Sequence, residues 1–114
     1  MKTQKPVDSR MIANNLRPYQ PTHPGEVLKD EIEFRGISQR GLARQLGISY
    51  SVLNEVLNGK RSLNTELALL IGAALDIEAA PLLAMQNDYN IQIAESNPSF
   101  MEKLKQLRKL AAAL

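Results

Sequence analysis

Apolar residues recur every three or four positions along most of this chain, which is the period of an amphipathic α-helix. From residue 22 onward the pattern divides into segments, most of which begin at a serine, threonine or asparagine and end at glycine or asparagine. The sequence predicts six helices, within residues 22–36, 38–47, 49–59, 64–75, 78–95 and 96–114. No segment alternates apolar and polar residues with the period of a strand. We therefore expect an all-α protein with five core helices and an extra C-terminal amphipathic helix.

Residues 1–21 are predicted to form an N-terminal arm ahead of this helical domain. Three prolines and the pair Asn14-Asn15 interrupt any long element there. Only residues 7–16 have the spacing of a short helix. Residues 22–95 then form the domain proper.

The composition excludes several kinds of site. The chain of 114 residues has no cysteine, which excludes disulfides, thiol catalysis and cysteine zinc sites. Its one histidine, His23, is interpreted as the residue that begins the first helix and not as a catalytic base. No apolar run approaches the ~20 residues that cross a bilayer, and the N-terminus lacks the apolar region of a secretory signal. We expect a cytoplasmic protein without catalytic residues, metal or cofactor.

Charge is distributed unevenly, although the net charge of the chain is only +2. Residues 38–61 contain four basic residues against Glu55, which is a net charge of +3. Residues 62–95 contain five acidic residues and no lysine or arginine, which is a net charge of −5. A basic block on an acidic body suits binding to a polyanion.

The segment from Ser38 to Arg61 predicts a helix-turn-helix. Gly47 stands where the first helix needs a left-handed C-cap, and Ser49 caps the second helix. The second helix, residues 50–58, then protrudes with polar side chains outward, and a helix of that diameter fits the major groove of DNA. The alternative is a helical hairpin whose polar face is merely solvated. The residues expected to wedge the two helices together are Leu42, Ala43, Leu46, Ile48, Leu53 and Val56.

This motif predicts a role for each exposed polar residue. We expect the outward groups of the second helix to read base edges, because they donate and accept hydrogen bonds. Groups at the starts of both helices and just after the second helix are placed to hold phosphates. The expected base-reading residues are Tyr50, Ser51, Asn54 and Glu55. The expected phosphate-binding residues are Gln39, Arg40, Ser49, Asn58, Lys60 and Arg61.

The stretch QRGLARQLGISYSVLNEVLNGKR resembles the XRE, lambda-repressor-like class of helix-turn-helix proteins. Over residues 22–95 the chain is similar to the HigA-type antitoxins, through HPGEVLKDEIEFRGISQRGLAR, LNGKR, ELALLIGAAL and LLAMQNDYNI. This resemblance implies a five-helix lambda-repressor-like fold and a homodimer that binds double-stranded operator DNA. It also implies a HigB-type partner toxin that is a RelE-like ribonuclease. The chain departs from the branch at Gly41, inside a motif helix, and at Pro81-Leu82, where an aromatic pair is common.

Two other functions remain as alternatives to an antitoxin. A stand-alone XRE repressor without a toxin partner has the same motif. An enzyme on a small α-helical scaffold is disfavoured, because the chain lacks cysteine, a phosphate loop and any paired catalytic motif.

The sequence leaves several partner surfaces open. The dimer seam is expected on the fifth helix, the last helix or both, at Leu82, Met85, Tyr89, Leu104 and Leu107. The last helix carries an apolar stripe that suits a dimer seam, a toxin-docking face or the core, and its basic residues also suit DNA phosphate. That stripe consists of Phe100, Leu104, Leu107 and Leu110.

We expect a toxin with a basic surface to bind either the acidic tract 62–95 or the first helix. Apolar residues of the arm or of the C-terminal tail, residues 96–114, would anchor it. We favour the arm over the tail's Phe100 and Leu104. The arm's anchors are Val7, Met11, Ile12, Leu16 and Tyr19. On the first helix, Glu26, Asp30 and Glu33 are interpreted as a solvated acidic face, with Lys29 paired to Glu26 or Glu33.

Overall fold

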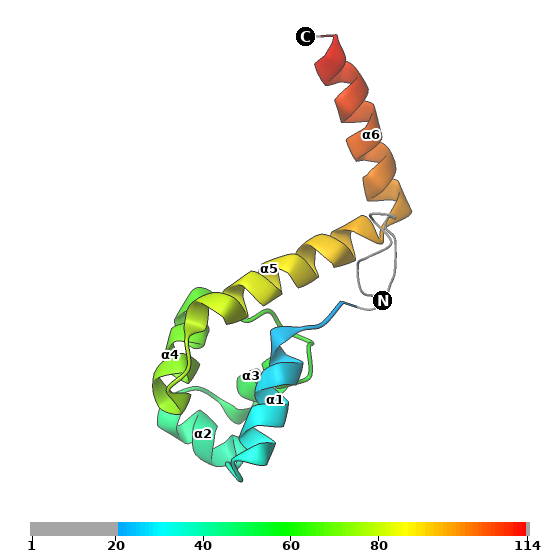
Figure 1. The fold of residues 1–114 in the computed structure, drawn as a ribbon. Helices are drawn as coiled ribbons and strands as arrows, with labels where there is room; N and C mark the ends of the chain where they lie inside the picture. The colour runs from blue at the N-terminus through cyan, green and yellow to red at the C-terminus, as the bar shows by residue number, and fades with distance from the viewer. Residues whose placement is uncertain (1–20, 114) are drawn as a thin grey trace, which may run out of the picture.

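The computed structural model describes residues 21–113, which form six helices and no strand. The helices are α1 (Pro24–Phe34), α2 (Gln39–Leu46), α3 (Tyr50–Leu57), α4 (Thr65–Leu75), α5 (Ala79–Glu95) and α6 (Pro98–Ala112) (Figure 1). The all-α prediction is confirmed. The predicted arm, with its short helix at 7–16, lies outside the described residues except for residue 21.

The predicted capping residues begin the helices. An N-cap side chain satisfies an amide group that the first helical turn leaves without a partner. Ser38, Ser49, Asn64 and Asn97 each accept a hydrogen bond from the amide three residues further on, at 2.9, 3.1, 2.8 and 3.1 Å. Glu78 precedes α5 without such a bond. The helix α5 therefore begins without a side-chain cap, and it packs against α4.

Gly41 has a local reason to stand inside α2. Glycine there costs about 1 kcal/mol of helix stability relative to alanine. The Gly41 amide donates to Ser38 Oγ at 2.9 Å, and a Cβ on Gly41 would lie 2.8 Å from the same oxygen. The capping bond occupies the space that an alanine methyl group would take.

A single apolar core joins the first five helices. The predicted wedge residues contribute to it, since Leu42, Ala43, Leu53 and Val56 are buried and Leu46 and Ile48 pack against them. The buried set consists of Leu28, Ile32, Leu42, Ala43, Leu53, Val56, Leu57, Leu63, Leu67, Ala68, Ile71, Leu75 and Leu82.

Three of the large apolar residues on α1 and α4 lie at the surface. Phe34 is 89% exposed, Leu70 43% and Val27 42%. A helix that packs on one layer buries only one stripe of its surface, so apolar residues beside that stripe stay in contact with solvent. The exposed positions on α1 and α4 are therefore surface available for partners.

The first helix approaches the third very closely at Gly25. A Cβ at this position would lie 1.8 Å from the carbonyl oxygen of Val56. Only glycine permits this approach, which fixes the end of α3 against the start of α1.

The last helix leads away from the rest of the molecule. Figure 1 shows α6 turning off the end of α5 and projecting clear of the helices α1–α4. It packs against α5, and none of its residues is buried. The five-helix domain with an extra C-terminal helix thus has its whole core without α6.

Candidate DNA interface

The turn between α2 and α3 has the backbone geometry that the sequence predicts. Gly47 adopts φ +74°, a left-handed conformation that glycine takes without strain. The amide of Ile48 then donates to the carbonyl of Ala43 at 3.1 Å, which closes α2. Ser49, two residues after Gly47, caps the start of α3, and the two helices pack against each other. This arrangement is a helix-turn-helix, in which the outer face of α3 carries polar groups.

An amide pair connects the start of α2 to the middle of α3. Nδ2 of Asn54 donates to Oε1 of Gln39 at 2.9 Å, and both side chains are half-buried. An amide nitrogen carries two hydrogens, so Asn54 keeps one N–H and its own oxygen for another partner. Those two groups are what a bidentate contact with adenine uses. Gln39 therefore orients Asn54 and leaves one N–H and the oxygen of the Asn54 side chain for another partner.

The first residues of the two motif helices also contact each other. The guanidinium of Arg40 lies 4.2 Å from the centroid of the Tyr50 ring, a cation–π contact. Tyr50 is 37% exposed and Arg40 is exposed. This contact holds the positive charge of Arg40 beside the N-terminal end of α3.

Two predicted contacts with DNA are paired to each other. Arg61 forms an ion pair with Glu55, with its Nε and Nη2 at 2.9 and 2.8 Å from Oε1. From the sequence alone, Glu55 is expected to contact bases and Arg61 to contact phosphate, independently of each other. In the structure the two charges compensate, so Arg61 must share or leave Glu55 in order to hold a phosphate at full strength.

Lys29 from α1 lies beside the C-terminal end of α3, and the sequence alone did not indicate this position. Its Nζ donates to Oδ1 of Asn58 at 2.9 Å, so the expected pairing with Glu26 or Glu33 is wrong. Asn58 in turn donates from Nδ2 to the carbonyl of Asn54 at 2.8 Å. The two residues are 29 positions apart, and only the packing of α1 on α3 brings them together. No local signal in the sequence indicates this contact.

The other predicted contacts are simpler. Ser49 is exposed and uses its hydroxyl to cap α3, while Ser51 and Lys60 are exposed. The amide of Lys60 donates to the carbonyl of Glu55 at 2.8 Å, which turns the chain back just after α3. This hydrogen bond holds Lys60 next to the C-terminal end of α3.

Buried polar groups from α5 and from the start of α1 support the loop after α3. Gln86 is 5% exposed, and its Oε1 accepts from the Leu63 amide at 2.8 Å. His23 caps α1 by accepting from the Gly25 amide at 2.9 Å, and its ring meets Tyr89 edge-on at 4.9 Å. Both Gln86 and Tyr89 lie in the stretch LLAMQNDYNI, which carries part of the resemblance, and these contacts give both residues a structural role.

The state of His23 follows from its surroundings. Burial lowers the pKa of the imidazole below its ordinary value of 6.5, against a backbone hydrogen bond with Arg61 and the charge of Glu26, which raise it. Neutral imidazole also suits the capping role, since the ring accepts a hydrogen bond through Nδ1. The interpretation of His23 as the residue that begins the first helix agrees with this geometry.

The predicted dimer-seam residues occupy very different environments in one chain. Leu82 is 7% exposed and belongs to the core, so it offers little surface to a second copy. Met85 and Tyr89 are half-buried on α5. On α6, Leu104 is half-buried and Leu107 is 50% exposed.

A small open pocket between the turn, α3 and α4 offers one carboxylate and one amide among apolar side chains; it is lined by Ile48, Val52, Asn64, Glu66, Leu67 and Leu70. Residues 21–113 contain no group of three or more histidines and acidic residues that is arranged to hold a metal ion. Within the same range no helix combines the length and apolar character of a membrane span.

These features together define a DNA-binding helix-turn-helix domain. A helix-turn-helix family model matches residues 28–82. Virulence-associated protein I of Dichelobacter nodosus is 33% identical over 76 residues, which are 66% of this chain and 70% of that protein.

Two solved structures are similar as well. A Pseudomonas aeruginosa protein in complex with its operator DNA is 31% identical, with a TM-score of 0.63 over 68% of this chain and 86% of the other. An addiction module antidote protein of the HigA family from Coxiella burnetii is 30% identical, with a TM-score of 0.64 over 79% of this chain and 94% of the other. The chain belongs to the XRE-type helix-turn-helix family of DNA-binding regulators, in the branch of the HigA-type antitoxins.

Proposed function

We propose that this protein is an antitoxin that binds an operator as a homodimer, represses its own operon and neutralises a toxin by direct binding. The observation that carries the DNA-binding part is the amide pair between Gln39 and Asn54 on a helix-turn-helix scaffold. The antidote protein from Coxiella burnetii and the operator complex from Pseudomonas aeruginosa support the antitoxin and repressor parts. No step needs catalysis, a metal or a cofactor.

In the proposed complex α3 enters the major groove. Asn54 reads a base with its free N–H and its oxygen, and Tyr50, Ser51 and Glu55 line the same face. Phosphate contacts come from the N-terminal end of α2 and from the loop after α3. The proposed phosphate-binding residues are Gln39, Arg40, Ser49, Asn58, Lys60 and Arg61, joined by Lys29 through its bond to Asn58.

The proposed toxin is a RelE-like, HigB-type ribonuclease. Such an enzyme must hold RNA phosphates, so its surface is basic. The outer side of α1 suits it, because Glu26, Asp30 and Glu33 are exposed beside the exposed apolar Val27 and Phe34. Exposed charges steer a partner and speed association, and apolar anchors supply affinity.

The arm, residues 1–21, precedes α1 by two residues in the sequence. We propose that the arm and the outer side of α1 together hold the toxin. The arm's apolar residues Val7, Met11, Ile12, Leu16 and Tyr19 would be the anchors.

One experiment tests the function as a whole. The protein is titrated into the DNA upstream of its own gene and into a scrambled duplex, at one fixed salt concentration, and the product of the adjacent gene is then added. We expect the upstream DNA to bind about a thousandfold more tightly, and the adjacent product to form a stable complex with the protein. Equal affinity for both duplexes contradicts operator recognition. Specific DNA binding with no toxin partner identifies a stand-alone repressor instead.

A further inference from the structure

The helix α6 carries an apolar stripe that the described residues, 21–113, leave largely uncovered. Phe100 is 42% exposed, Leu107 50% and Leu110 64%, and no residue of α6 is buried. The stripe has helical spacing and includes the half-buried Leu104. A stripe of this kind on a projecting helix is suited to a partner's groove.

The charges beside the stripe indicate which sign of charge a partner surface must carry. By helical geometry Lys103 and Arg108 flank the stripe, whereas Lys105 and Lys109 lie on the far side of the helix. The ion pairs among residues 21–113 are Glu31–Arg35 and Glu55–Arg61, so these cations have no acidic partner within that range. Like charges would repel if two copies of α6 paired with each other. The toxin of the proposed function is also basic, so its surface would repel these cations.

A matching surface lies on α4. Leu69 is 58% exposed and Leu70 43%, and the exposed small residue Ala73 follows one turn later. Leu70 also lines the open pocket that reaches Ile48 and Val52. This apolar surface has acidic borders, with Glu66 at one end and Asp76 and Glu78 at the other. It is therefore the complement of α6 in both polarity and charge.

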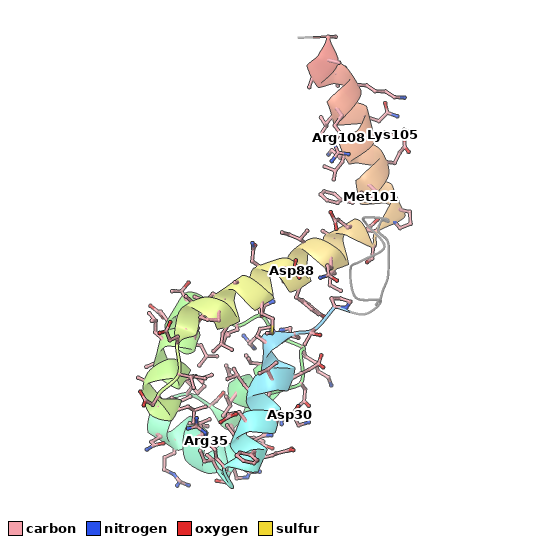
Figure 2. The ribbon with its side chains drawn as sticks, in the orientation of Figure 1. Asp30, Arg35, Asp88, Met101, Lys105 and Arg108 are labelled. Carbon is pink, nitrogen blue, oxygen red and sulfur yellow. The ribbon has the colours of Figure 1, made fainter. Side chains whose placement is uncertain are left out.

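The two surfaces are far apart within one chain. Figure 1 shows α4 at one end of α5 and α6 at the other, and Figure 2 shows Lys105 and Arg108 on α6 well away from the body. The 17 residues of α5 separate them by about 25 Å. A contact between α6 and α4 is consequently a contact between two molecules.

We propose that α6 of one copy packs into the α4 surface of a second copy, and that the second copy returns the same contact. Lys103 and Arg108 then face Glu66 of the partner, and Leu104 and Leu107 cover Leu69 and Leu70. Such a reciprocal exchange obeys the two-fold symmetry of a closed dimer. The inference rests on the homodimer of the proposed function and states which surfaces form it.

Charge reversal tests the exchange by sedimentation velocity without DNA. Glu66→Lys places like charges in both contacts of its homodimer, and so does Lys103→Glu/Arg108→Glu. We expect each variant alone to raise the dimer Kd at least about tenfold. An equimolar mixture of the two variants has opposite charges in both contacts, so dimers should return to the wild-type level. That recovery also demonstrates that both variants are folded.

Matched controls carry the same charge changes elsewhere. Asp88→Lys on α5 and Lys105→Glu/Lys109→Glu on the far side of α6 should dimerise like the wild type. The exchange is overturned if Glu66→Lys dimerises normally, if the mixture stays monomeric, or if Asp88→Lys weakens the dimer equally. It is also overturned if Lys103→Glu/Arg108→Glu keeps its dimer and loses only DNA affinity, because α6 would then bind phosphate. Operator recognition is measured separately through the DNA affinity of Asn54→Ala. The α6–α4 exchange and operator recognition can therefore fail independently of each other.

Discussion

At the scale of single residues, the polar side chains of the proposed DNA interface hold one another before any DNA is bound. Asn54 is held by Gln39, Arg40 by Tyr50, and Arg61 by Glu55. A side chain that is already oriented loses less entropy when it binds a base or a phosphate. The face is therefore preorganised, and each pair makes the effect of one substitution depend on the other residue.

Asn54→Ala should lower affinity for the best operator by about 1–3 kcal/mol and for random DNA much less. The reason is the bidentate contact that its remaining N–H and oxygen can make with adenine. Fluorescence anisotropy on both duplexes at one salt concentration measures the difference. Equal losses on the two duplexes would exclude base reading. A double-mutant cycle with Gln39→Ala should give a coupling of about 0.5 kcal/mol or more on the operator.

Lys60→Ala should weaken binding to all sequences alike and reduce the slope of log K against log salt by about one. Arg61→Ala should change the slope less, because the charge of Arg61 is already compensated by Glu55. Affinities measured at four or five salt concentrations give both slopes. A wild-type slope in Lys60→Ala removes it from the phosphate contacts, and equal changes in both variants contradict the role of Glu55.

His23 should make stability depend on pH. Its folded pKa is lowered by burial, so the unfolded chain binds more protons between the folded value and the ordinary value of 6.5. The stabilising contribution is present in full above pH 6.5 and is lost as pH falls toward the folded pKa. Thermal unfolding at pH 7.5 and 5.5 should show a lower Tm for the wild type at pH 5.5. His23→Asn keeps a capping side chain and should lose this part of the dependence; an unchanged pH dependence in the variant contradicts the assignment.

At the scale of elements, α6 lies outside the five-helix core, and the arm precedes that core in the sequence. We propose a partner for each segment, because their chemistry differs. The arm precedes the acidic outer side of α1, whereas α6 is basic. This difference in charge is the reason to assign the toxin to the first and a second copy of the chain to the other.

Deleting residues 1–20 should abolish toxin neutralisation and leave operator binding largely intact, because the motif and its core lie within residues 23–86. Co-expression with the toxin, scored by growth, tests the first part, and anisotropy on the operator tests the second. Full neutralisation by the shortened protein would rule out the arm. The outer side of α1 would then be tested through Asp30→Lys, and the tail through Phe100→Ala.

At the scale of the whole molecule, removing α6 should separate folding from assembly. A chain that ends at residue 96 keeps every buried residue of the core, so its Tm should stay within a few degrees of the wild type. Its dimer should be weaker. Its affinity for an operator with two half-sites should therefore fall more than its affinity for a single half-site. Light scattering and anisotropy measure these two effects. A truncated protein that dimerises as well as the full chain would exclude α6 from the seam.

The sequence by itself determined the helices, the motif and the apolar wedge between the two motif helices, because those features depend on neighbours within one or two turns. Ser38, Gly47 and Ser49 act on amides and carbonyls three to five residues away, so their spacing alone predicts the helix-turn-helix. Tertiary structure decided which polar groups meet. Lys29 reaches Asn58, Gln39 reaches Asn54, and Gln86 reaches the Leu63 amide across 29, 15 and 23 positions. Packing of separate helices creates such contacts, and helical periodicity carries no information about which helices pack together. The same packing left the large apolar residues Phe34 and Leu70 at the surface.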